Sequence, residues 1–167
     1  DDADSRAIVV DADLLSLTLA LASGTEADSI ARFAQYVAAY PALPMFRFIL
    51  GRLEATAGSP AEARRLVEAG FTGGLRGLAN DHFRLIALVF LGETAAALAD
   101  RDLSSTAAAA LEPYAGRVAT VPPVMAGAVD ATRARLSRGL GDAASAERQY
   151  RRALDTELAL GATAFAA

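Results

Sequence analysis

The sequence predicts an all-α fold made of helical hairpins that follow one another along the chain. Alanine makes up about a quarter of the 167 residues, and alanine and leucine are among the strongest helix formers. β-Branched residues are few and scattered, so a sheet would lack its usual side chains. Short turn signals also recur between segments whose apolar residues have helical spacing. All three observations favour a repeat of helices.

The turn signals lie at intervals close to those of a known helical repeat. They include Gly24, Gly58, Asp100 and Gly141, at successive intervals of 34, 42 and 41 residues. The first interval equals the tetratricopeptide period of ~34 residues, and the longer two fit the same unit with an extended loop. We therefore predict one domain over residues 1–167, a tetratricopeptide-like array of about four antiparallel hairpins forming a right-handed superhelix. The expected hairpins span 7–40, 43–71, 82–115 and 123–160, and a final helix is expected from residue 162.

Apolar positions within these hairpins fall on helix faces. In the second hairpin the spacing i, i+3, i+4, i+7 is occupied by Phe46, Ile49, Leu50 and Leu53. Ser59 is the expected N-cap of the next helix and Pro60 its first residue. Residues 85–91 are apolar throughout, which predicts an interior helix. The fourth hairpin is expected to begin after Pro122 and Pro123, because proline does not fit a helix interior.

Composition excludes several classes of protein. The chain has 16 basic and 20 acidic residues, a net charge of −4 and a pI near 5.0, which argues against direct binding of nucleic acid. It has no cysteine, hence no disulfide and no thiolate zinc site. The longest apolar runs, 85–91 and 17–22, are shorter than the ~18–20 residues that a membrane span needs. The opening residues show no basic segment before an apolar stretch, so we expect no signal peptide and a cytoplasmic piece of a longer protein.

Three motifs resemble one bacterial family. Residues 40–47 (Tyr-Pro-Ala-Leu-Pro-Met-Phe-Arg) are similar to a hairpin junction of that family, and residues 112–117 (Glu-Pro-Tyr-Ala-Gly-Arg) to one of its loops. Residues 141–150 and 160–162 resemble its last hairpin and closing turn. The family is the C-terminal tetratricopeptide-like array of large signalling ATPases. Such arrays occur in LuxR-type transcriptional regulators and in proteins with a class III adenylate cyclase domain.

The resemblance implies a role in signalling or transcription regulation for the longer protein, without an enzyme in this segment. A phosphate-binding Gly-x-x-x-x-Gly-Lys motif is absent, since the chain has no lysine. His82 is the single histidine. We expect Asp81 to be the N-cap of the following helix and His82 to lie on the surface in its first turn. Residues 70–77 are rich in glycine but lack a phosphate-loop spacing, which favours a flexible connection. We expect no catalytic residue, cofactor or metal.

Arginines concentrate late in the chain, while the first thirty residues are acidic. The late group consists of Arg133, Arg135, Arg138, Arg148, Arg151 and Arg152. Two interpretations stay open. The group can be a solvated surface with pairs such as Glu147–Arg151, or a contact surface for an acidic partner or for self-association of the array.

A binding groove follows from aligning the repeats. In tetratricopeptide arrays the first helix of each pair lines the concave face. Aligning the small residues Gly51 and Ala134 places Arg52, Arg135 and Arg138 toward that face, with Glu93 or Thr94 in the middle unit. Guanidinium groups bind carboxylates through paired hydrogen bonds. We therefore expect a non-enzymatic scaffold or sensor that binds a protein segment or a neighbouring domain of the same polypeptide.

The alternative function is a small-molecule inducer receptor that binds its ligand inside the array. Its cavity would be lined by aromatic side chains, drawn from Phe46, Phe71, Phe83, Phe90, Tyr114, Tyr150 and Phe165. Aromatic residues at helical spacing are more often core, so packing is favoured over a ligand site. A closed apolar pocket with a few polar groups would distinguish the receptor from the scaffold.

Overall fold

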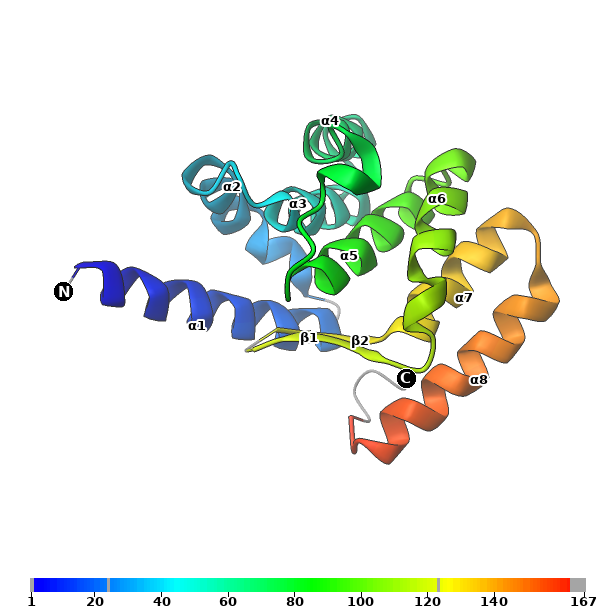
Figure 1. Cartoon of the computed structure of the whole chain (residues 1–167). Helices are drawn as coiled ribbons and strands as arrows, with labels where there is room; N and C mark the ends of the chain where they lie inside the picture. Colours follow the sequence, from blue (N-terminus) through cyan, green and yellow to red (C-terminus); the bar gives the residue numbers. More distant parts are fainter. Residues whose placement is uncertain (1, 24, 123, 163–167) are drawn as a thin grey trace.

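Helices account for most of the chain that the structure, a computed structural model, describes, namely residues 2–23, 25–122 and 124–162 (Figure 1). This confirms the all-α class. The α-helices are α1 (Asp2–Ser23), α2 (Ile30–Ala39), α3 (Pro44–Ala57), α4 (Pro60–Gly70), α5 (Arg84–Ala97), α6 (Arg101–Leu111), α7 (Val129–Leu140) and α8 (Ala143–Ala159). Short 3₁₀ turns are η1 (Glu26–Ser29), η2 (Gly74–Gly77) and η3 (Glu112–Tyr114), and the strands are β1 (Val118–Val121) and β2 (Val124–Ala128).

Three of the four turn signals end one helix and start the next. Gly58 adopts a φ of +93° after α3, and Ser59 and Pro60 then stand at the N-cap and first position of α4, as predicted. Asp100 caps α6 by accepting a hydrogen bond from the backbone N–H of Leu103 at 3.1 Å. Asp142 caps α8 in the same way. Gly24, the first signal, lies outside the described residues.

Consecutive helices pack as the pairs α3–α4, α5–α6 and α7–α8, and α5 also contacts both α3 and α7. Residues 86–92 of α5 are buried without a break, which confirms the predicted interior helix. Gly92 permits the close approach of α5 and α7, because a Cβ there would lie 2.8 Å from Cγ2 of Thr132. The core is thus continuous along the first helices of the three pairs.

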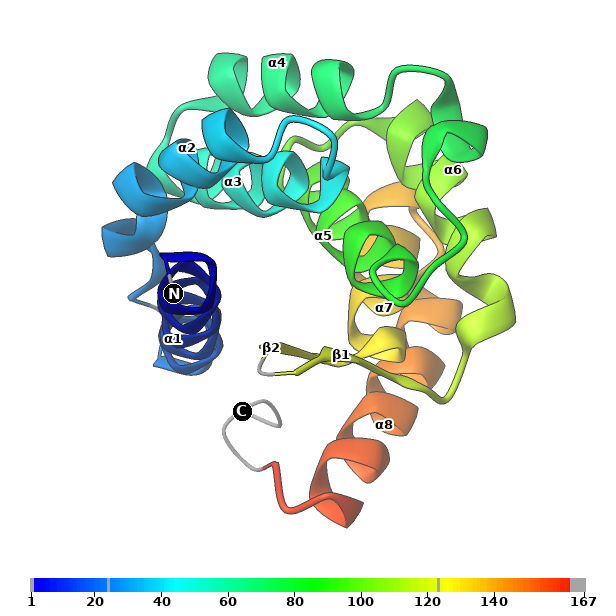
Figure 2. The ribbon, with the colours of Figure 1, turned by 60° about the vertical axis from the view of Figure 1, so that its left-hand side comes forward.

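The helices follow an arc that begins at α1 and ends at α8 (Figure 2). The first expected hairpin, 7–40, contains α1 and α2, but α2 packs on α3 whereas α1 contacts β2. A buried carboxylate joins the two helices: Asp13 accepts hydrogen bonds from Tyr36 and Arg32 of α2. Burial, followed by the bond to Asp13, raises the pKa of the Tyr36 hydroxyl.

The start of the expected fourth hairpin, 123–160, was predicted wrongly. Residues 124–128 form strand β2, which pairs antiparallel with β1, and α7 begins at Val129. Val121 pairs with Val124, so Pro122 lies in the turn between the strands. The valines favour extended backbone, and contacts with α1, α5 and α8 stabilise this β-hairpin. It crosses the inner side of the arc (Figure 2).

At the other end, Leu160 and Gly161 form a turn after α8, with a φ of +68° at Gly161. Ala162 is not helical, and the rest of the final helix expected from residue 162 lies outside the described residues. Within the ranges that the structure describes, none of the helices has the length and apolar character required to cross a bilayer.

Candidate functional site

The four residues predicted to line a binding groove lie together in the structure. Arg52 of α3, Glu93 of α5, and Arg135 and Arg138 of α7 line one open pocket of about 510 Å³. Tyr150 of α8 also lines it. We call this pocket the arginine groove.

The helical repeat places these side chains at equivalent positions. Each of three residues directly follows a small buried one: Arg52 follows Gly51, Glu93 follows Gly92, and Arg135 follows Ala134. The small residues face the neighbouring helices, so the next residue on each helix is turned toward the groove. In the middle unit it is Glu93 that lines the groove. Thr94 is buried, and its hydroxyl donates to the backbone oxygen of Phe90 at 2.8 Å.

Glu93 organises the charges of the groove. Its Oε1 accepts hydrogen bonds from the hydroxyl of Thr132 at 2.6 Å and from the guanidinium of Arg135 at 2.9 Å. Its Oε2 lies 3.9 Å from Nε of Arg52. The negative charge of Glu93, which is 13% exposed, is the main cause of a raised pKa of the Arg135 guanidinium. Glu93 therefore holds two arginines in place.

The groove keeps a positive excess, since three guanidinium groups face one carboxylate. Arg138 is exposed, and within the described ranges its side chain has no hydrogen bond or ion pair. An arginine in that state presents its donors to solvent, and a carboxylate or phosphate matches the spacing of those donors. The arrangement is suited to holding an anionic group.

The remaining late arginines have different roles. Asp130, which is 1% exposed, accepts hydrogen bonds from Arg133 at 2.8 Å and from Arg152 at 2.9 Å. Arg133 also bonds Glu112, and the backbone N–H of Gly116 donates to Asp130 at 2.9 Å. The network is buried at Asp130 and Arg133, and it joins the loop after α6 to α7 and α8. Arg148 and Arg151 remain on the surface of α8, bonded to Ser145 and to Glu147 respectively.

One prediction about the sequence before α5 needs correction. Asp81 is not the N-cap: α5 begins at Arg84, and the Asp81 carboxylate instead accepts from the backbone N–H of Phe83 at 2.9 Å. His82 is exposed, as expected, and its ring centroid lies 4.0 Å from that of Phe83. The glycine-rich segment 70–77 lies between the pairs α3–α4 and α5–α6, as expected of a connection, and it contains η2. The guanidinium of Arg84 donates to the backbone oxygen of the following Leu78 at 2.8 Å.

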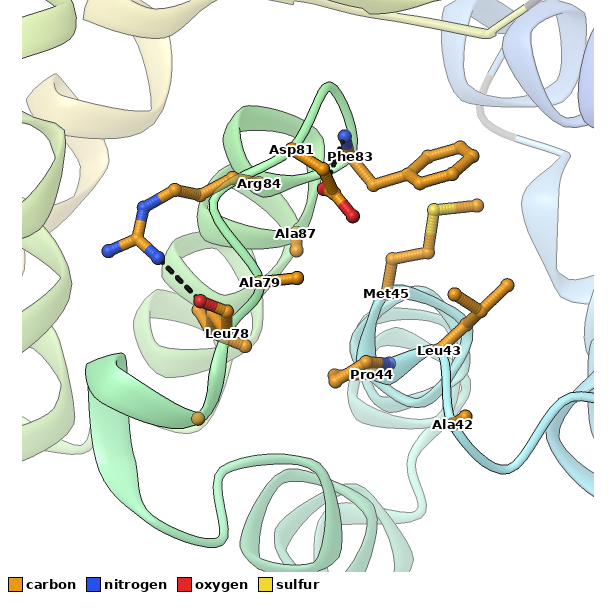
Figure 3. Close-up of a pocket in the computed structure, with 11 residues that line it drawn as sticks. Ala42, Leu43, Pro44, Met45, Leu78, Ala79, Asp81, Phe83, Arg84 and Ala87 are labelled. Carbon is orange, nitrogen blue, oxygen red and sulfur yellow. Dashed lines mark hydrogen bonds between the residues drawn. The ribbon is translucent and has the colours of Figure 1, made fainter.

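A second, apolar pocket contains Phe46 and Phe83 of the aromatic set expected for the alternative receptor, but its position in the fold was not predicted. It has a volume of about 430 Å³ and lies where α1, the N-terminus of α3, the turn before α5 and the tip of the β-hairpin meet. We call it the aromatic pocket, lined by Leu14, Tyr40, Met45, Phe46, Phe83 and Val121 together with the exposed side chains of Asp11 and His82. A smaller pocket of about 70 Å³ adjoins it and shares Leu43, Met45 and Phe83 with it (Figure 3).

The expected aromatic set divides between these places. Phe46 and Phe83 line the aromatic pocket, Tyr150 lines the arginine groove, and Phe90 is buried core. Phe165 lies outside the described residues. Among the described residues, no group of three or more His, Asp or Glu side chains is arranged to hold a metal ion.

Comparison with known proteins found no family model, no curated protein and no solved structure that matches this chain.

Proposed function

We propose that the chain is a non-enzymatic, tetratricopeptide-like scaffold whose arginine groove binds a carboxylate-rich protein segment. The serial pairs α3–α4, α5–α6 and α7–α8, with α5 between the other two first helices, support the serial stacking of hairpins that a right-handed superhelix of this type requires. The motifs at 40–47 and 112–117 support an origin in a cytoplasmic bacterial ATPase that acts in signalling or transcription regulation. The partner would then be a neighbouring domain of the same polypeptide or another protein.

The positive excess of the arginine groove is the observation that carries the proposal. Three arginines come from α3 and α7, the two helices that flank α5, and the carboxylate of Glu93 on α5 orients two of them. An acidic segment laid along the groove would pair first with Arg138, whose guanidinium already faces solvent. Charge-assisted bonds to the other two would follow without moving Glu93.

A dye-labelled hexaglutamate peptide tests this, with a hexaglutamine peptide as the neutral reference and fluorescence anisotropy as the readout. We expect the acidic peptide to bind more tightly than the neutral one. The double substitution Arg135→Ala and Arg138→Ala should weaken the binding of the acidic peptide at least ~tenfold. Equal anisotropy changes for both peptides would contradict the proposal.

The matched control is the double substitution Arg148→Ala and Arg151→Ala. It removes the same charge from the exposed surface of α8, outside the groove. We expect less than about a twofold loss of affinity, because exposed charges act weakly through solvent. Equal losses in the two double variants would show that the peptide responds to net charge and would overturn a groove-specific interaction.

The alternative function, a small-molecule receptor, is favoured by the aromatic pocket alone. The pocket is mainly apolar, carries a few polar groups and has a volume within the ~300–1,000 Å³ typical of ligand sites. It shares no lining residue with the arginine groove, so the two functions can be tested separately.

A further inference from the structure

The aromatic pocket lies at the opposite ends of α3 and α5 from the arginine groove. Met45 is in the first turn of α3, whereas Arg52 is about two turns further along the same helix. Phe83 directly precedes α5, whereas Glu93 is in its second half. The two sites are therefore formed by different segments and have separate linings.

Aromatic rings form one wall of the pocket. The rings of Tyr40 and Phe46 have centroids 5.6 Å apart, and Tyr36 lies behind them at 5.4 Å from Phe46. Phe83 lines the pocket from the turn before α5, with His82 beside it. The faces of such rings carry negative potential and attract cations, an effect that is stronger where water is excluded.

The charged groups around the pocket have the opposite sign to those of the groove. Asp11 lines the aromatic pocket, and within the described ranges its carboxylate has no hydrogen bond or ion pair. Asp81 lines the adjoining small pocket, and one of its oxygens accepts from Phe83 N–H. Arg84 also lines the small pocket, but Figure 3 shows its guanidinium turned away toward the Leu78 carbonyl that it bonds.

We propose that the aromatic pocket binds a small organic amine, a molecule with an apolar body and one ammonium group. The body would occupy the space between Leu14, Met45 and Val121, and the ammonium would lie against Tyr40 or Phe83 and pair with Asp11. The inference rests on the alternative function, a receptor, and is independent of peptide binding in the arginine groove.

The inference is tested by titrating the whole chain with 2-phenylethylamine, 2-phenylethanol and 3-phenylpropionate at pH 7. Binding is measured from changes in NMR chemical shift. The three probes share a phenyl body and differ in charge. We expect the amine to bind at least about fivefold more tightly than the alcohol, and the carboxylate to bind most weakly. Shifts should concentrate at Tyr40, Phe83 and Val121. Shifts confined to the arginine groove would overturn the assignment.

Two variants separate the charge from the cavity. Asp11→Asn should lower the affinity for the amine about fivefold and leave the alcohol unchanged, whereas Asp28→Asn, an exposed change outside the pocket, should alter neither. Phe83→Ala should lower the affinity for both the amine and the alcohol. Equal affinity for amine and alcohol would overturn the inferred ligand class but keep the receptor function. Absence of binding by all three probes would overturn both.

Discussion

The carboxylate of Glu157, near the end of α8, accepts a hydrogen bond from the backbone N–H of Ala128 at 3.0 Å. Ala128 is the last residue of β2, so this bond joins α8 to the β-hairpin. Burial raises the pKa of Glu157 above its ordinary value of 4.5, while the bond to Ala128 and the charge of Arg135 act in the opposite direction.

Glu157→Gln should change how stability depends on pH. Above pH 4.5, and up to the raised pKa, the folded protein holds more protons at this site than the unfolded chain. The free energy of unfolding therefore falls as the pH rises through that window. The amide keeps an acceptor for Ala128 but does not ionise. We expect the free energy of unfolding of the variant, measured with urea, to increase relative to that of the parent protein between pH 4.5 and pH 7. Glu147→Gln, exposed on the same helix, is the control.

Asp130→Ala should destabilise the protein by about 3–5 kcal/mol, since it leaves the buried Arg133 without its partner on the same helix. It also removes the acceptor for the backbone N–H of Gly116. Urea unfolding measures the cost. The comparison is Glu147→Ala, which breaks an exposed ion pair with Arg151 and should cost no more than about 0.5 kcal/mol. Similar costs for both variants would contradict a buried network.

Gly92→Ala and Gly139→Ala should have opposite effects on thermal stability. A Cβ at Gly92 would lie 2.8 Å from Thr132, and overpacking of α5 against α7 costs about 1–3 kcal/mol. A Cβ at Gly139, within α7, would meet nothing within 4 Å. Alanine should there stabilise the helix by about 0.5–1 kcal/mol. Two shifts of the same sign would contradict the described packing.

Thr18→Val should loosen the contact between α1 and the β-hairpin. The hydroxyl of Thr18 accepts a hydrogen bond from the backbone N–H of Met125 at 3.0 Å, and valine has no acceptor there. We expect a loss of about 1 kcal/mol and faster hydrogen exchange at the Met125 amide. Ser16→Ala removes a hydroxyl that bonds within α1, and should leave that amide unchanged.

The sequence predicted those features of the fold that depend on residues close together in the chain. The spacing of Phe46, Ile49 and Leu53 predicts one buried face of α3, and the turn at Gly58–Pro60 predicts the start of α4. The arginine groove could also be predicted from the sequence, because equivalent small residues in successive repeats bring Arg52, Glu93 and Arg135 to one side.

The β-hairpin and the aromatic pocket could not be predicted in this way. The strands are short, and partners far along the chain stabilise them: Thr18 bonds Met125 across 107 residues, and Glu157 bonds Ala128 across 29. Segments from Asp11 to Val121 meet at the pocket, none of which carries a local signature of a cavity. Periodicity describes what a segment buries, and it contains no information about which distant segment lies opposite.

The β-hairpin has a mechanical consequence. A row of helix pairs held by contacts between neighbours bends through small rotations at every pair. Here α1 is attached to β2 at Thr18, and α8 is attached to the same strand at Glu157. Pulling the two ends apart therefore loads those bonds before it separates any helix pair. The arc should stay stiff up to a threshold force and then open abruptly, and a molecule seated beside Val121 would alter that threshold.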